Sequence, residues 1–169
     1  MTRSPDIIAG DLRENTDNLF RFQDSVDEHI FDNKPSDNEW SVKDCCEHII
    51  VIEKALTYIF QGNIEKTTKD PERKIELIRN VFQDFEKKYP APEPFRPAGA
   101  VQNKAEVKEK FSKTRNELLR IGDKMNWIDV CLDFRHAGFG VMTRVEWIYF
   151  CIYHTERHLH QMRSIVERV

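Results

Sequence analysis

Six histidines stand in the 169-residue sequence, and two of them, His154 and His158, are four residues apart. In a helix this spacing places both imidazoles on one face, with about 6 Å of axial rise between them. Two imidazoles in that relation can hold one metal ion, as they do in the zinc-protease helix. The protease pattern also needs a glutamate as general base, and Glu156 lies two residues from each histidine and points elsewhere. The pair therefore predicts metal binding without protease chemistry.

Both imidazoles are expected to face inward, because helical spacing joins them to an apolar stripe made of Cys151, Met162 and Ile165. His48 lies on the apolar stripe of an earlier helix and has the same environment. A buried imidazole without a partner costs roughly 1–3 kcal/mol, and a metal ion removes that cost by taking a lone pair from each ring. Three inward histidines on two helices favour one facial metal site. The alternative interpretation is that each is a hydrogen-bonded core histidine.

Other potential ligands are weaker candidates. Glu47 is expected to face solvent, and Cys45 and Cys46 are most simply small buried residues. His136 falls in a predicted loop and is expected to be exposed, and His160 is expected to lie on the surface. Among the potential ligands, the inward-facing histidines are therefore the stronger candidates.

Three neutral histidines leave a divalent metal with its positive charge and at least one open coordination position. Such a metal can lower the pKa of a bound water for hydrolysis, or can bind and deprotonate a thiol. The same ligands serve both reactions, so they do not choose between them. Zinc is the expected ion, and nickel, iron or manganese would also fit imidazole ligands. Gln161 and Glu47 are candidates to orient the rings from outside.

Apolar residues recur at three- and four-residue steps along most of the chain and predict helices. Four long helices are expected over about residues 7–30, 42–62, 103–124 and 143–168, with one short accessory helix over about 70–88. Capping-box patterns mark the starts of the second and last long helices, Ser41 with Asp44 and Thr143 with Glu146. Four prolines make residues 89–97 extended, and 126–142 is expected to be a loop. No strand-like alternation exceeds a few residues, so the predicted fold is an all-α bundle.

Composition excludes several classes of protein. Lys plus Arg total 26 against 29 Asp plus Glu, which argues against a non-specific nucleic-acid binder. No apolar run approaches the ~20 residues that span a bilayer, and the N-terminus does not resemble a signal peptide. The four cysteines show no disulfide-scaffold spacing. We expect one cytoplasmic domain over residues 1–169 that binds neither nucleic acid nor membrane.

Two regions resemble motifs of the DinB-like superfamily. The segment Trp40-Ser41-Val42-Lys43-Asp44-Cys45-Cys46-Glu47-His48-Ile49 resembles its second-helix motif, in which a Trp precedes a helix that bears a metal histidine. Residues 140–148 and 154–161 resemble a Gly-x-x-Thr-x-x-x-Trp turn that leads into a His-x-x-x-His helix, with Arg157 before the second histidine and Gln161 three residues after it. One departure is the segment 136–138, His-Ala-Gly, where relatives frequently have His-Pro before the Gly.

The resemblance implies an up-down-down-up four-helix bundle, often dimeric, with a divalent metal held by His48, His154 and His158. Characterised relatives include transferases and isomerases that use small thiols such as bacillithiol or mycothiol, and proposed metal-dependent hydrolases. We therefore expect a metal-dependent transferase that acts on a small molecule with a low-molecular-weight thiol. The alternatives are a metal-dependent hydrolase and a non-catalytic metal-binding or stress-response protein. A homodimer is expected, through exposed apolar residues of the first and third long helices.

Overall fold

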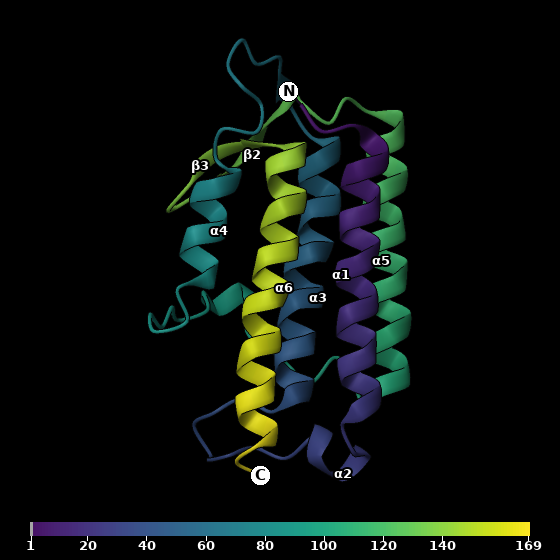
Figure 1. Cartoon of the computed structure of the whole chain (residues 1–169), viewed down its shortest axis with the longest axis vertical. Helices are drawn as coiled ribbons and strands as arrows, with labels where there is room; N and C mark the ends of the chain where they lie inside the picture. The colour runs from purple at the N-terminus through teal and green to yellow at the C-terminus, as the bar shows by residue number, and fades with distance from the viewer. Residues whose placement is uncertain (1) are drawn as a thin grey trace.

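The computed structural model describes residues 2–169. Its four long helices are α1 (Pro5–Ser25), α3 (Val42–Gln61), α5 (Lys104–Lys124) and α6 (Arg144–Val166). They lie side by side along the longest axis of the molecule (Figure 1). In that view α1 and α6 run downward and α3 and α5 run upward. None of the helices in residues 2–169 is long and apolar enough to cross a membrane.

The two capping boxes are confirmed. The Asp44 amide donates to Ser41 Oγ and the Ser41 amide donates to Asp44 Oδ2, both at 3.1 Å. The Glu146 amide donates to Thr143 Oγ1 at 3.2 Å, and the Thr143 amide to Glu146 Oε2 at 3.0 Å. Each box satisfies amides that a helix start leaves unpaired. They fix where α3 and α6 begin, and therefore which face of each helix its histidines occupy.

The first helix differs from the prediction. It ends at Ser25, Val26 is extended (φ −91°, ψ 130°), and a separate short helix, α2, spans Glu28–Phe31. Val26 and Phe31 are nevertheless both buried. The apolar period continued across the break because both sides face the same core, so the sequence alone did not reveal it.

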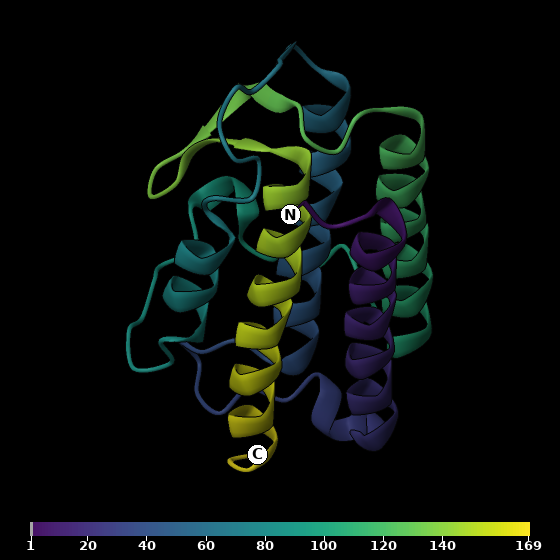
Figure 2. The ribbon, with the colours of Figure 1, turned by 45° about the horizontal axis from the view of Figure 1, so that its top comes forward.

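A small sheet corrects the all-α prediction. Strands β1 (Ile64–Glu65), β2 (Val130–His136) and β3 (Gly140–Thr143) form an antiparallel sheet in the order β1-β2-β3, with Cys131 opposite Ile64 and Met142. It caps the end of the molecule where α6 begins (Figure 2). Four of the seven β2 residues are exposed in succession, so burial does not alternate along the strand. The sequence of residues 126–142 therefore shows no strand pattern and predicts a loop. The protein is mostly helical, with a three-stranded sheet.

The accessory elements are also more numerous than the one helix expected over 70–88. Helix α4 covers only Ile75–Gln83, and a 3₁₀ turn, η1 (Glu93–Phe95), lies within the proline-rich stretch. Helix α4 packs against α6, outside the four long helices (Figure 2). Its buried residues are Ile75, Ile78 and Phe82, whereas Phe85 is exposed beyond its end. On α5, Phe111 and Leu118 are buried, and Met125 is 37% exposed because it follows the helix end.

We predict that Gly122→Ala destabilises the protein. A Cβ at this position in α5 would overlap the six-membered ring of Trp127, which is buried against Phe60. Overpacking of this kind typically costs about 1–3 kcal/mol, more than the gain of up to about 1 kcal/mol in helix propensity. Urea unfolding should show the loss. The matched control is Gly10→Ala in α1, where a Cβ meets nothing within 4 Å and where the substitution should be neutral or stabilising. Equal effects at the two positions would contradict the prediction.

Candidate metal centre

Three histidine side chains from two helices meet inside the protein. His48 comes from α3, and His154 and His158 from successive turns of α6. Their exposed fractions are 4%, 5% and 7%. Nε2 of His154 lies 3.2 Å from Nε2 of His48 and 3.1 Å from Nε2 of His158. The structure therefore brings together all three residues that the sequence proposed as ligands, and in the described chain they form a group that could hold a metal ion.

The outer nitrogens determine the protonation of two of these rings. Nδ1 of His48 lies 2.6 Å from the carbonyl oxygen of Phe95, and Nδ1 of His158 lies 2.8 Å from Oε1 of Gln161. Both oxygens only accept hydrogen bonds, so each Nδ1 carries the hydrogen. The Nε2 atoms of His48 and His158 consequently present lone pairs, and both lone pairs point toward His154.

Hydrogen bonding alone does not satisfy this arrangement. A ring nitrogen has one in-plane position, which holds either a hydrogen or a lone pair. Nε2 of His154 can therefore pair with His48 or with His158 but not with both. A cation at the point of convergence accepts all three lone pairs. Metal–nitrogen bonds of about 2.0–2.1 Å place neighbouring ligand nitrogens about 2.9–3.4 Å apart, which agrees with the 3.1 and 3.2 Å separations. The donor set fits a divalent metal.

Burial keeps all three rings neutral. Desolvation lowers the pKa of His48, and it lowers that of His154 well below the usual range with help from the neighbouring His158 and His48 rings. The pKa of His158 falls to about 3, first through desolvation and then through His48. Neutral imidazoles have free lone pairs at neutral pH. Nδ1 of His154 is buried and has no hydrogen-bond partner among the described residues.

We predict that the metal-free protein loses stability as the pH falls from about 6.5 toward 3. The unfolded chain protonates histidine near pH 6.5, whereas folded His158 has a pKa of about 3, so the unfolded state binds more protons in this window. Each pH unit within the window then removes about 1.4 kcal/mol for this one group. Urea unfolding with chelator at several pH values measures the slope. His158→Asn should flatten it, whereas the substitution of the exposed His160 by Asn should not. A slope that His158→Asn leaves unchanged would refute this linkage.

The surrounding residues fall only partly where the sequence placed them. Gln161 does hold a site ring, as expected. Glu47 was expected to face solvent; instead it is 1% exposed and accepts a hydrogen bond from the Ala98 amide at 2.6 Å. It is buried because the connection between α4 and α5 covers that side of α3, which no local pattern reveals. His160 is exposed and stacks on Phe85.

His136 is not the exposed loop residue that was predicted. It lies at the end of β2, is half-buried, and stacks on the Phe139 ring with Trp147 and Phe150 nearby. Phe150 in turn stacks on His154, with ring centroids 5.5 Å apart. His136 therefore belongs to the aromatic wall behind the histidines rather than to the ligand set.

Aromatic rings form the rest of the walls around the three histidines. Trp40 lies 5.0 Å from the His48 ring and 6.3 Å from the His158 ring, and Phe82 lies 5.3 Å from the His154 ring, measured between centroids. Sequence reasoning missed Phe82 and the Phe95 carbonyl as neighbours. A backbone carbonyl carries no residue-specific signal, and the expected accessory helix gave no indication of which side of α6 it would cover.

The cysteines do not supply a nucleophile. All four are buried and free. Burial raises the pKa of Cys46 to about 12 and that of Cys131 to about 11, and it raises the pKa of Cys45 and Cys151 well above the usual range. A thiol with a raised pKa and no access to solvent is unreactive at neutral pH. A thiolate nucleophile must therefore come from outside the chain.

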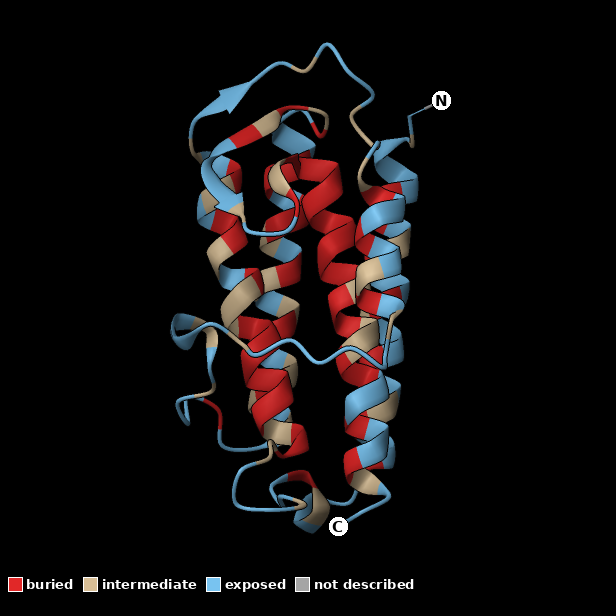
Figure 3. Cartoon of the chain, turned by 90° about the vertical axis from the view of Figure 1, so that its left-hand side faces the viewer, coloured by how far each residue is buried: buried red, intermediate tan, exposed pale blue. Residues whose placement is uncertain are grey.

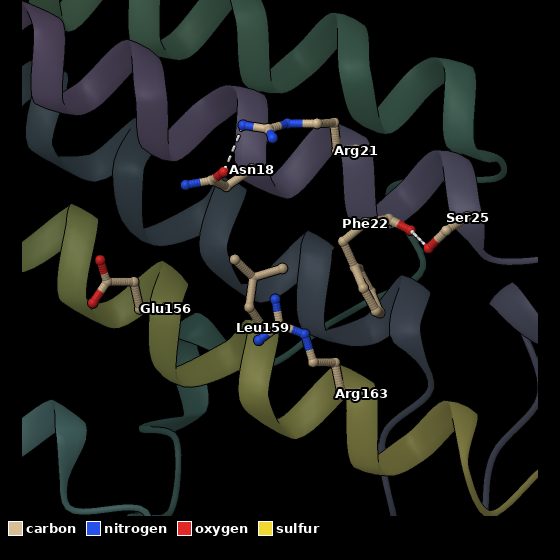
Figure 4. Close-up of a pocket in the computed structure, with 7 residues that line it drawn as sticks. All are labelled: Asn18, Arg21, Phe22, Ser25, Glu156, Leu159 and Arg163. Carbon is tan, nitrogen blue, oxygen red and sulfur yellow. Dashed lines mark hydrogen bonds between the residues drawn. The ribbon is translucent and has the colours of Figure 1, made fainter.

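The surface grooves lie away from the histidines. A groove of about 530 Å³ between α1 and α6 has Phe22 and Leu159 on its floor and Arg21, Arg163 and Glu156 around it (Figure 4). A second, of about 370 Å³, lies at the start of α5. Neither contains a histidine. The histidine cluster therefore lies away from both of these grooves.

Comparison with known proteins places these features in a family context. A family model described as the DinB superfamily matches residues 11–162. A Bacillus subtilis (strain 168) protein, named Uncharacterized protein YuaE, is 29% identical over 138 residues, which cover 80% of this chain and 83% of the relative. No solved structure matches the chain.

Proposed function

The chain belongs to the DinB superfamily, and we propose that His48, His154 and His158 hold one divalent cation in a transferase that joins a low-molecular-weight thiol to a small molecule. The observation that carries the proposal is the convergence of three Nε2 atoms, two of them fixed as lone-pair donors. Zinc is the first expectation, and nickel, iron or manganese are compatible with imidazole ligands.

When bound, a divalent cation favours the deprotonated form of a thiol or a water molecule. The chain's own residues prepare for this in two ways. Gln161 and the Phe95 carbonyl hold two rings in the orientation that ligation needs. The apolar surroundings, including Trp40 and Phe82, keep the imidazoles neutral and exclude bulk water.

One feature of the described chain favours a thiol substrate over water. The protein's own cysteines are buried and protonated, so a sulfur nucleophile would have to arrive with a substrate. No carboxylate joins the three histidines in the cluster found among residues 2–169. Hydrolysis by an activated water commonly uses such a carboxylate as general base, whereas a thiol that loses its proton on binding does not need one. The hydrolase is therefore the second candidate.

A third candidate is a non-catalytic metal-binding or stress-response protein. The coverage of the histidines, each at most 7% exposed, favours it. An enzyme must admit its substrate to this site, whereas a protein that only stores or senses a metal need not.

One assay separates the three candidates. Untagged protein loaded with zinc is incubated with a haloaromatic electrophile and a small thiol, with and without chelator. A thiol-dependent loss of the electrophile that the chelator abolishes supports the transferase. Chelator-sensitive cleavage of an activated ester without thiol would identify a hydrolase. Metal-loaded protein inert in both assays would refute catalysis.

The wider proposal includes the family's up-down-down-up bundle, which the directions of α1, α3, α5 and α6 support. It also includes a homodimer in the cytoplasm, with a small-molecule substrate as partner. Sedimentation of the untagged chain over a range of concentrations measures the oligomeric state, and a monomer at every concentration would exclude the dimer.

A further inference from the structure

The connection between α4 and α5 covers the histidine cluster. Residues 84–100 of this connection, which we call the strap, cross the outside of the long helices as an exposed segment (Figure 3). Phe95 of the strap places its carbonyl oxygen 2.6 Å from Nδ1 of His48. With the strap in place, the three histidines are at most 7% exposed, so the converging Nε2 atoms are covered.

No buried side chain anchors the strap. Every residue from 84 to 100 is exposed or half-buried, and η1 is its one short regular element. Pro90, Pro92, Pro94 and Pro97 lack amide hydrogens, so they cannot donate backbone hydrogen bonds to the rest of the fold. A segment with few buried contacts opens at low free energy, independently of global unfolding. A few contacts outside the core therefore keep this one closed. They include the Phe95 carbonyl on His48, the Phe85 ring stacked on His160 and the Lys110 ammonium on the Ala100 carbonyl, and two further contacts tie its ends.

Arg157 forms the first of these contacts. It lies on α6 between His154 and His158, and its guanidinium donates to the carbonyl oxygens at the end of α4 and the start of the strap. Nη1 lies 2.9 Å from the Asp84 oxygen and 3.2 Å from that of Phe82, and Nη2 donates to the Lys87 oxygen. The Tyr89 ring centroid is 5.1 Å from Cζ.

Glu47 forms the second contact, at the other end of the strap. Glu47 lies one residue before His48 on α3, and its buried Oε1 accepts a hydrogen bond from the Ala98 amide at 2.6 Å. The two ends of the strap are therefore tied by residues adjacent in sequence to site histidines, Arg157 beside His158 and Glu47 beside His48. Neither residue joins the cluster of potential ligands.

We propose that the strap is the gate of the metal centre, and that Arg157 and Glu47 are positioning residues that hold it closed. The inference rests on the proposed function, because a gate has meaning only where a substrate or ion must enter. Release of either tie lets residues 84–100 move away and exposes the three imidazoles, without the loss of any side chain from the core.

Modification of metal-free protein by diethyl pyrocarbonate tests the gate. Mass spectrometry follows each histidine separately, and the exposed His29, which lies outside the strap's contacts, serves as the internal reference. Arg157→Ala and Glu47→Ala should each speed the modification of the three site histidines by roughly 10- to 100-fold, the factor associated with one hydrogen bond to a charged group. Glu47→Gln keeps an oxygen acceptor for the Ala98 amide and should stay protected. Arg163→Ala, on the same helix but away from the strap, is the matched control.

Hydrogen exchange on the same variants separates a gate from general loosening. Faster amide exchange confined to the strap supports the proposal, whereas equally faster exchange throughout α6 would overturn it. Wild-type protection of the histidines in both alanine variants would also overturn it. Release of zinc to a chelator should rank the variants in the same order. If the protein binds no zinc, the proposed function fails, and the measurements on metal-free protein still decide whether the strap opens.

Discussion

Replacing His154 and His158 together by alanine is expected to abolish metal binding. The double variant leaves His48 as the one remaining imidazole of the cluster, and a single neutral ligand does not retain a divalent ion through purification. Loss of an outer partner that orients a ligand already costs about 10- to 100-fold in affinity, so removal of two ligands must cost far more. The fold should persist, because alanine has the highest helix propensity and both positions lie within the long helix α6.

Metal analysis of untagged protein measures this effect. The matched control is His29→Ala with His160→Ala, which removes the same number of imidazoles from exposed positions. The control should keep its metal. Gln161→Ala should weaken binding by the smaller factor, since it removes only the acceptor that orients His158. Equal metal content in the wild type and the His154/His158 variant would disprove the site assignment.

Removal of Arg115 is expected to cause the largest loss of stability. Its guanidinium is buried on α5 and donates to both carboxylate oxygens of Glu53 of α3, from Nη2 at 2.7 Å and from Nε at 3.0 and 3.3 Å. It also donates to Asn15 of α1 at 2.9 Å and to Thr155 of α6 at 2.8 Å. One side chain therefore connects all four long helices. Arg115→Ala should cost about 3–5 kcal/mol, because it leaves the Glu53 carboxylate buried and unpaired.

Urea unfolding of a double-mutant cycle tests this interpretation. Arg115→Met combined with Glu53→Leu removes both charges and should be clearly more stable than Arg115→Met alone, since buried ion pairs replaced by apolar residues lose little. The surface pair of Arg120 and Glu117 provides the control, where the same cycle should yield less than about 1 kcal/mol. Additive losses at Arg115 and Glu53 would show that the pair has no special role.

The buried ion pair of Arg115 and Glu53 belongs to a polar layer that interrupts the apolar stripes of two helices in the sequence. The apolar stripe of the first long helix skips from Leu12 to Leu19, and Asn15 fills that gap. The stripe of α5 skips from Phe111 to Leu118, and Arg115 fills that gap. Interruptions at the same depth in different helices indicate a shared polar layer. Only packing showed that they meet, because each interruption alone is typical of a solvated face.

Local patterns predicted the helices well for a physical reason. A capping box and a helical period are satisfied by residues within a few positions of each other, so α3 and α6 could be predicted at both ends. Strand β2 could not, because it has no alternating burial of its own, and it pairs with β1, far away in the sequence, as well as with the neighbouring β3. The sequence pattern does not predict the break after Ser25, because the apolar period continues through it.

The sequence by itself determined which histidines face inward, since helical spacing fixes the face on which His48, His154 and His158 lie. It also determined that the protein's own charges nearly balance. The tertiary structure decided how the three rings are used. The Phe95 carbonyl sets one tautomer, Glu47 is buried beneath the strap, and Arg157 ties that strap to α6. These contacts join backbone groups and side chains that lie far apart along the chain, and they exist only once the helices have packed.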